Sequence, residues 1–183
     1  MALGPEFLDV FEAIKERRSV RSFLERVVSR SDLIEIIESG MSAPSAGNMQ
    51  SWEFVIVRDP IRKRALARAA FHQEFIAEAP VVIVVLANQF RSASVYGARG
   101  AQLYAIQDTS AAVENMLLAA HGMSLGACWV GVFNEDAVSR IVKATKHVKP
   151  VAIVPLGYPD LFPDASPRKP VSEVIHEEEY IAR

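Results

Sequence analysis

Apolar and polar residues recur along the chain with two different periods, and these periods divide it into helices and strands. Apolar residues at helical spacing predict helices over residues 9–18, 61–70, 102–123 and 135–144, another beginning near residues 31–32, and a short piece ending at residue 78. Continuous apolar runs predict strands over residues 54–57, 81–87, 127–132 and 151–156. The run 81–87 is the clearest strand, because it is rich in β-branched residues and follows Pro80. The polar stretch 88–100 contains glycine and serine and predicts a mobile loop.

The longest predicted helix, residues 102–123, is apolar on most of its sides. Ile106, Val113 and Leu117 lie on one stripe, and further apolar residues such as Met116 widen the surface well beyond that stripe. A helix of this kind is buried on most sides, either in a large core or at a dimer interface. A lone subunit is expected to expose part of it.

The end of the chain has a different character. From Tyr158 onward it contains Pro159, Pro163, Pro167 and Pro170. Such a tail cannot form a core of its own, so it either stays flexible or wraps around something. The order of the elements, without repeat or linker, favours one α+β or α/β domain over residues 8–183. Residues 1–7 are typical of a leader left from cloning and are excluded from the fold.

Composition excludes several classes of function. The 183 residues carry 20 Lys and Arg against 22 Asp and Glu, a net charge of -2, so no overall positive field is present for nucleic acid. The longest apolar run, 81–87, is too short to span a bilayer, and no secretory signal pattern opens the chain. The single cysteine, Cys128, excludes an intramolecular disulfide. We therefore expect a cytoplasmic protein that binds neither membrane nor nucleic acid.

The first candidate site is basic. Arg17, Arg18, Ser19 and Arg21 place three guanidinium groups and one hydroxyl within five residues. Arginine presents a planar fork of donors that matches phosphate oxygens, so this segment suits a phosphate group. Taken alone, an ordinary basic helix end exposed to solvent is the simpler interpretation.

Two further segments could contact a ligand. In the loop 44–52, Asn48 and Gln50 can each donate and accept hydrogen bonds, which suits the mixed edge of a flavin or nucleobase. An ordinary loop anchored by Trp52 is equally compatible with that sequence. Gly131, near the end of the predicted strand 127–132, permits close approach of the backbone to a ligand, although a plain buried strand is simpler.

The remaining polar residues give weaker signals. Arg168 and Lys169 in the tail are by default a solvated pair. The four histidines have no partner histidine at i+4, so a metal site is not expected. The chain also lacks a Gly-x-Gly-x-x-Gly sequence after a strand, a Walker motif and a Gly-x-Ser-x-Gly elbow.

Five motifs, in order and at compatible spacings, resemble the nitroreductase family. They are Arg-Arg-Ser-Val-Arg-Ser-Phe at 17–23, Ala-Pro-Ser-Ala-Gly-Asn-Met-Gln-Ser-Trp at 43–52, the helical segment 104–120, Cys-Trp-Val-Gly-Val-Phe at 128–133, and Leu-Gly-Tyr-Pro at 156–159 before the Arg168-Lys169 pair. The resemblance extends over residues 8–180. It implies an α+β fold with a central, mostly antiparallel sheet flanked by helices. It also implies FMN bound noncovalently at a homodimer interface, with the C-terminal tail wrapping the partner subunit.

The resemblance further implies how the basic residues meet FMN. Arg17 and Ser19 are expected to face the flavin phosphate, and Arg18 the phosphate or the ribityl chain. Arg21 is expected at the N1–C2=O edge of the ring, where a fixed cation stabilises the negative charge created by reduction. Arg168, with Lys169 as a weaker candidate, completes the phosphate clamp.

The other matching residues are expected around the ring. Asn48 and Gln50 are implied to contact the isoalloxazine, and Pro44 and Ser45 to come from the partner subunit. The strand formed by Trp129, Val130 and Gly131 lines one flavin face, with the Gly131 amide near N5 or O4.

The implied activity is a ping-pong cycle. Hydride passes from NAD(P)H to flavin N5, and a nitroaromatic, quinone or similar acceptor then takes its place in the same pocket. Ser51 stands where many members have proline, and the region 88–100 is short compared with larger members. The acceptor and the choice between NADH and NADPH therefore stay open. So do two alternatives: a relative that breaks down flavin or dehalogenates reductively, and a noncatalytic flavin-binding sensor dimer.

Overall fold

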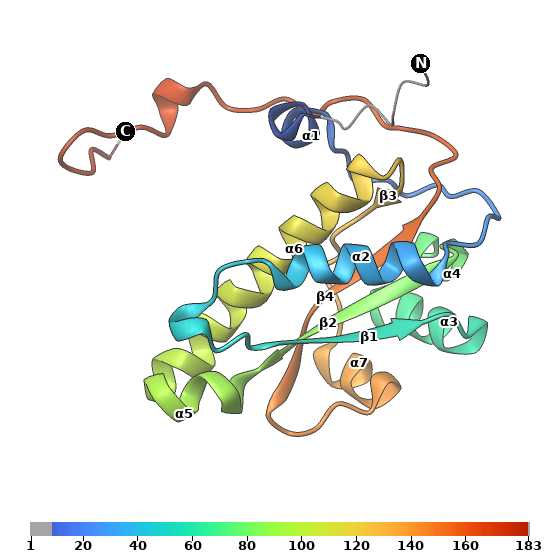
Figure 1. Cartoon of the computed structure of the whole chain (residues 1–183), viewed down its shortest axis with the longest axis horizontal. Coiled ribbons are helices and arrows are strands. Elements are labelled where there is room, and N and C mark those ends of the chain that lie inside the picture. The colour runs from blue at the N-terminus through green and yellow to red at the C-terminus, as the bar shows by residue number, and fades with distance from the viewer. Residues whose placement is uncertain (1–8, 183) are drawn as a thin grey trace, which may run out of the picture.

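The computed structural model describes residues 9–182 and has a four-stranded sheet at its centre (Figure 1). The strands β1 (Trp52–Val57), β2 (Val81–Asn88), β4 (Val148–Gly157) and β3 (Gly126–Ala127) lie in that order, and every neighbouring pair is antiparallel. The expected α+β class with an antiparallel sheet is confirmed. The leader predicted over residues 1–7 lies outside the described residues.

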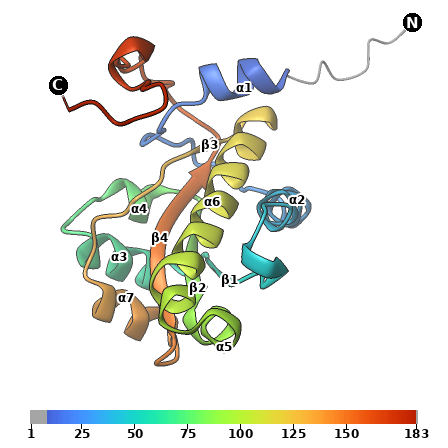
Figure 2. The ribbon, with the colours of Figure 1, turned by 90° about the vertical axis from the view of Figure 1, so that its left-hand side faces the viewer.

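Helices cover both faces of the sheet (Figure 2). The helices α2 (Arg30–Met41) and α6 (Ala105–Gly122) pack on one face, and α3 (Pro60–Ala69), α4 (Phe75–Glu78) and α7 (Glu135–Val142) on the other. In β2, Ile83 and Val85 belong to the α2–α6 layer, whereas Val82 and Val84 belong to the opposite layer. A strand buried on both faces needs apolar residues at every position, which explains the continuous run in the sequence.

Side-chain caps set the starts of three helices. The Ser29 hydroxyl accepts a hydrogen bond from the Asp32 amide at 3.0 Å, and Asp59 accepts from the Arg62 amide at 2.8 Å. Asn134 accepts from the Ala137 amide at 2.8 Å. Each cap satisfies one of the amides that a helix start leaves without an internal partner.

Two predictions about secondary structure are wrong. Residues 88–100, predicted as a mobile loop, form the helix α5 (Gln89–Arg99), followed by a π-helical turn at Gly100–Tyr104. The Asn88 side chain caps α5, and Gly97 provides a kink with φ of 57°. The predicted strand 127–132 is the two-residue β3, with one isolated bridge from Val130 to Ile153. The ladder stops there because the next residue, Cys128, faces Pro155. The nitrogen of Pro155 carries no hydrogen that it could donate back to Cys128.

Apolar side chains are more exposed on the first helix than on the long helix α6. On the first helix, α1 (Val10–Glu16), Val10, Phe11 and Ile14 are 58%, 77% and 57% exposed. In contrast, the apolar residues of α6 are buried or half-buried within the subunit. Although α2 and the sheet cover one side of that helix, Ile106, Ala111, Leu118 and Ala119 stay half-buried, so a lone subunit exposes part of α6, as expected.

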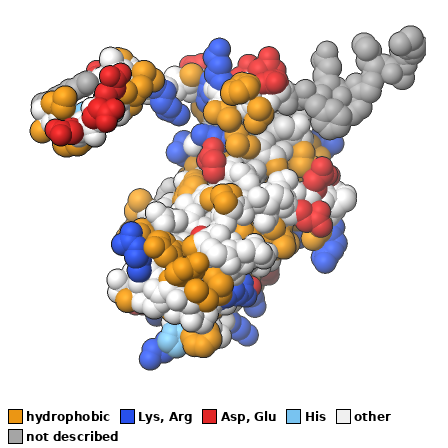
Figure 3. Space-filling view, turned by 60° about the vertical axis from the view of Figure 1, so that its left-hand side comes forward, with side chains coloured by type: hydrophobic (Ala, Val, Ile, Leu, Met, Phe, Trp, Pro, Cys, Tyr) orange, Lys and Arg blue, Asp and Glu red, His pale blue; other side chains and the backbone are white. Residues whose placement is uncertain are grey.

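The tail after Tyr158 is largely extended and exposed, with one short 3-10 turn, η3 (Val171–Glu173). In the space-filling view the end of the tail stands away from the body at the upper left and carries apolar beside acidic side chains (Figure 3). Among the described residues, no helix is long and apolar enough to cross a membrane.

Candidate functional site

The basic segment 17–21 is fixed beside β3. The Val20 side chain is fully buried, and its amide donates to the Ala127 carbonyl at 3.0 Å. Gly126 makes this contact possible, since a Cβ there would lie 2.7 Å from the Val20 side chain. Because successive side chains alternate around an extended backbone, burying Val20 turns Ser19 and Arg21 outward.

The guanidinium groups of this segment are incompletely neutralised. Arg17 lies 3.8 Å from the Glu114 carboxylate on α6, a loose ion pair. Arg18 donates to the main-chain carbonyls of Lys15 and Arg17 at 2.7 and 3.0 Å, and Arg21 donates to the Ser19 carbonyl at 3.3 Å. Within residues 9–182, Glu114 is the only carboxylate within 4.0 Å of these three groups. The excess positive charge suits a dianionic phosphate, which needs several cations.

The segment 128–131 adjoins these cations. Val130 is buried and exchanges two hydrogen bonds with Ile153, at 2.9 and 3.0 Å, and Trp129 packs half-buried against the core. Gly131 is exposed, and a Cβ there would meet only the Trp129 indole nitrogen, at 3.8 Å. The backbone at Gly131 is therefore open to close approach.

Cys128 links the two segments. Burial raises the pKa of its thiol, while Arg21 and a hydrogen bond with Ser19 act in the opposite direction. The thiol is thus kept protonated and lies beside the basic segment, without the exposure that a reactive cysteine requires.

A turn between α3 and α4, to which the sequence analysis gave no role, completes this group. Phe71 and His72 both have left-handed backbone conformations, with φ of 57° and 63°. Gln73 donates to the Val132 carbonyl at 3.3 Å, and the Phe75 ring lies 5.8 Å from the Arg21 guanidinium. A left-handed phenylalanine is a strained conformation that no sequence signal predicts, because glycine and asparagine normally occupy it.

The loop 44–50 is the other candidate segment, and it contains the 3-10 turn η1 (Ala46–Asn48). Gly47, Asn48 and Gln50 all have positive φ, at 55°, 56° and 49°. Pro44 is exposed, and the Ser45 hydroxyl accepts from the Gln50 amide at 3.0 Å. The side-chain amides of Asn48 and Gln50 lie together, since Nε2 of Gln50 donates to Oδ1 of Asn48 at 3.3 Å.

Within one chain, the loop and the basic segment lie toward opposite ends of α6 (Figure 1). The loop is attached near the start of the helix, where the Ala46 amide donates to Asp108 at 3.0 Å. The basic segment is bonded to Ala127, just after the helix ends at Gly122. At about 1.5 Å per residue, Asp108 lies about 21 Å from Gly122 along the axis of α6, while the long Arg17 side chain reaches back to Glu114, about 9 Å from Asp108 along the same axis. The structure therefore brings together the 17–21 and 129–131 groups but leaves the loop apart from them.

No contact joins Arg168 or Lys169 of the tail to the basic segment within the described residues. Arg168 and Lys169 are exposed, and Arg168 donates to the Ser166 carbonyl of the tail itself at 3.5 Å. Closer to the body, the Phe162 ring lies edge-on to His121, with ring centroids 6.0 Å apart. Burial lowers the pKa of His121; Glu16 opposes this effect, and the nearby arginines reinforce it.

Comparison with known proteins decides the family. The sequence model of the nitroreductase family matches residues 14–73 and 61–158. The chain belongs to the nitroreductase family. It is 34% identical to the NADH dehydrogenase of Thermus thermophilus over 195 residues, covering 92% of this chain and 95% of the other. It is 26% identical to the FMN reductase (NADPH) of Bacillus subtilis over 185 residues, covering 94% and 74%.

Solved structures of the family have the same fold. NfrA2 of B. megaterium superimposes with a TM-score of 0.87 at 27% identity, covering 93% of this chain and 74% of the other. The NfrA1 nitroreductase of B. subtilis gives 0.86 at 25% identity, covering 96% and 76%. The resemblance inferred from the five sequence motifs is confirmed.

Proposed function

We propose that this nitroreductase-family chain is an FMN-dependent oxidoreductase that uses NAD(P)H and works as a homodimer. The observation that carries the proposal is the position of Arg17, Arg18 and Arg21, whose charges are only partly neutralised, beside the exposed backbone of Gly131. Relatives named FMN reductase (NADPH) and oxygen-insensitive NADPH nitroreductase support the cofactor and the activity. When bound, FMN supplies the redox chemistry by accepting hydride at N5 and passing it to an acceptor, in a ping-pong cycle.

The residues present fit FMN. Arg17, Arg18 and Ser19 offer charge-assisted and hydroxyl donors to its phosphate. Arg21, held over Phe75 and bonded to the Ser19 carbonyl, offers a fixed cation to the N1–C2=O edge. The 129–131 segment offers a flat, partly apolar wall on which a ring can lie.

The homodimer is proposed to complete each site. A two-fold axis across α6 pairs two copies of this helix in opposite directions, so the start of one lies beside the end of the other. That arrangement brings Pro44, Ser45, Asn48 and Gln50 of one subunit toward the basic segment of its partner. It also offers cover for the exposed apolar residues of α1 and of the tail.

The tail has a role in the same assembly. Its extended course lets it reach over the partner subunit, and there Arg168, with Lys169 as a weaker candidate, can approach a flavin phosphate. On the grounds of the sequence, we propose the cytoplasm as the compartment.

One spectroscopic experiment tests the function. The absorption spectrum of the purified protein is recorded without oxygen, before and after NADH and NADPH are added separately. We expect flavin bands that bleach on addition of one or both nucleotides and return when a quinone or nitroaromatic is added. Bound flavin that neither nucleotide reduces would favour a noncatalytic binding protein, and a protein that takes up no FMN would refute the proposal.

A further inference from the structure

Gln50 has an unusual backbone environment. Its φ of 49° lies in the left-handed region, which is unfavourable for a residue with a Cβ. Its two main-chain polar groups are both bonded to side chains. The amide donates to the Ser45 hydroxyl at 3.0 Å, and the carbonyl accepts from Arg91 at 2.5 Å. Side chains therefore specify the conformation of Gln50.

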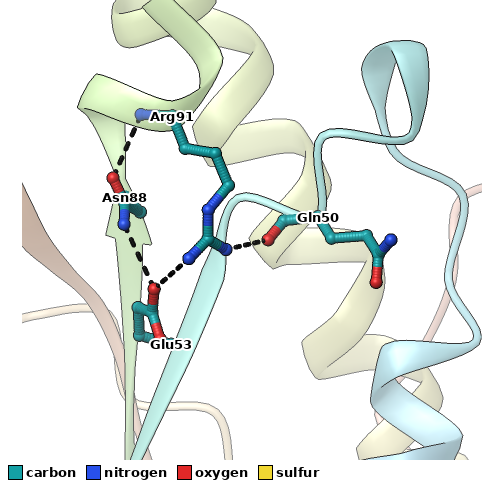
Figure 4. A network of polar contacts seen from close by, with 4 residues as sticks. All are labelled: Gln50, Glu53, Asn88 and Arg91. Atoms are coloured by element: carbon teal, nitrogen blue, oxygen red, sulfur yellow. Dashed lines mark hydrogen bonds and ion pairs between the residues drawn. The ribbon is translucent and has the colours of Figure 1, made fainter.

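Arg91 is itself held from two directions (Figure 4). While one terminal nitrogen donates to Gln50, the other donates to the Glu53 carboxylate at 2.6 Å. Asn88 donates to the same carboxylate oxygen at 3.1 Å and accepts from the Arg91 amide at 3.1 Å. Both terminal nitrogens of the guanidinium thus have an acceptor, and the side chain connects α5, on which Arg91 lies, to the start of β1 and to the loop.

The side chain of Gln50 extends away from this network (Figure 4), and its amide lies 3.3 Å from the Asn48 side chain. On the other side, Ser51 and Trp52 are buried, so the chain cannot adjust after Gln50. With the main chain held at both of its polar groups, side-chain rotation is the remaining freedom of this residue.

We propose that Arg91 is a positioning residue for the flavin. By holding the Gln50 carbonyl, it fixes the direction in which the Gln50 amide meets the isoalloxazine of FMN. Without Arg91, the left-handed conformation loses its support and the amide leaves the ring. This inference rests on the proposed function, because it requires Gln50 to contact bound FMN.

The test compares Arg91→Ala with Arg58→Ala. Arg58 is a matched control because it also donates to a main-chain carbonyl, that of Val28 at 2.9 Å, but outside the loop. The FMN dissociation constant is measured by quenching of flavin fluorescence, together with the visible circular dichroism of bound flavin and the unfolding temperature of the apoprotein. We expect Arg91→Ala to weaken FMN binding roughly tenfold and change the flavin spectrum, with little effect from Arg58→Ala. Arg91→Lys keeps the charge but lacks the two-pronged fork, so it should give an intermediate loss and serves if the alanine variant does not fold.

A double-mutant cycle separates positioning from general stabilisation. In a Gln50→Ala background, Arg91→Ala should cause no further loss of FMN affinity, because the side chain through which it acts is gone. An equal loss in both backgrounds, or a loss matched by Arg58→Ala, would overturn the inference while leaving the proposed function intact. If the wild-type chain does not bind FMN, both fail together.

Discussion

A flavin site shared between two subunits can be tested by mixing two defective chains. In one chain Arg17 and Arg21 are replaced by alanine, which removes the cations of the basic segment. In the other, Asn48 and Gln50 are replaced by alanine, which removes the amides of the loop. Since the loop is bonded near the start of α6 and the main chain of the basic segment is bonded beyond its end, each site is expected to take one segment from each subunit.

The expected recovery follows from the geometry. A heterodimer of the two chains has one site built from both intact segments and one site in which both are defective. Random pairing of equal amounts makes half of the dimers mixed, so about one quarter of all sites regain wild-type composition. If both segments served the same site within one chain, every site would keep one defect and none would recover.

The assay measures bound FMN per subunit by absorbance, and flavin reduction by NADH or NADPH without oxygen. Two different affinity tags isolate the mixed dimer, in which about half of the sites should be intact. Each variant alone serves as the control, and light scattering checks that both are dimers. A mixed dimer with no more FMN than its parents would refute the shared site, as would a stable, flavin-loaded wild-type monomer.

Three further predictions concern single residues. Arg17→Ala should leave a folded protein whose FMN dissociation constant rises about 10- to 100-fold, the loss of one charge-assisted contact; unchanged binding in a fluorescence titration would remove Arg17 from the site. Arg21→Ala should lower the two-electron potential of the bound flavin and slow its reduction more than it weakens binding, and a dye-equilibration titration showing the wild-type potential would place Arg21 elsewhere. Burial lowers the pKa of His121, so the stability it contributes is present above its ordinary pKa and is lost as the pH falls through the lowered pKa. Unfolding temperatures measured from about pH 5 to 7.5 should therefore fall less on acidification in His121→Gln than in the wild type, and equal falls in the two proteins would contradict this role of His121.

Local patterns predicted most of the fold. The strand β2 was recognisable because burial on both faces leaves an unbroken apolar run. The starts of α2, α3 and α7 coincide with residues whose side chains bond the first amides. α5 was missed because its polar and glycine-containing sequence is typical of loops, and its shape depends on the Asn88 cap and on the close packing of Gly100 against Ser92.

The candidate site, too, could be predicted from the sequence only in part. Arg17, Ser19 and Arg21 lie close together in the sequence, so their common chemistry was visible there. Gln73 and Arg91 were not predicted, because they reach the site through partners 59 and 41 residues away. The apolar pattern indicated that part of α6 is left uncovered, but it did not indicate that the apolar residues of α1 are exposed further still. Periodicity shows that a helix has an apolar side and does not show what covers it.

The strand β2 belongs to both core layers, and this affects how the protein unfolds. Neighbouring residues of this strand belong to opposite cores, so neither layer can come apart without exposing apolar surface on the strand that both use. The sheet and its helices should therefore unfold as one cooperative unit, with the amides of β2 among the last to exchange with solvent, and the tail after Tyr158 among the first. Asn88, the last residue of β2, bonds both Glu53 and the start of α5. The orientation of the Gln50 loop is thus anchored to the part of the molecule that should open least often.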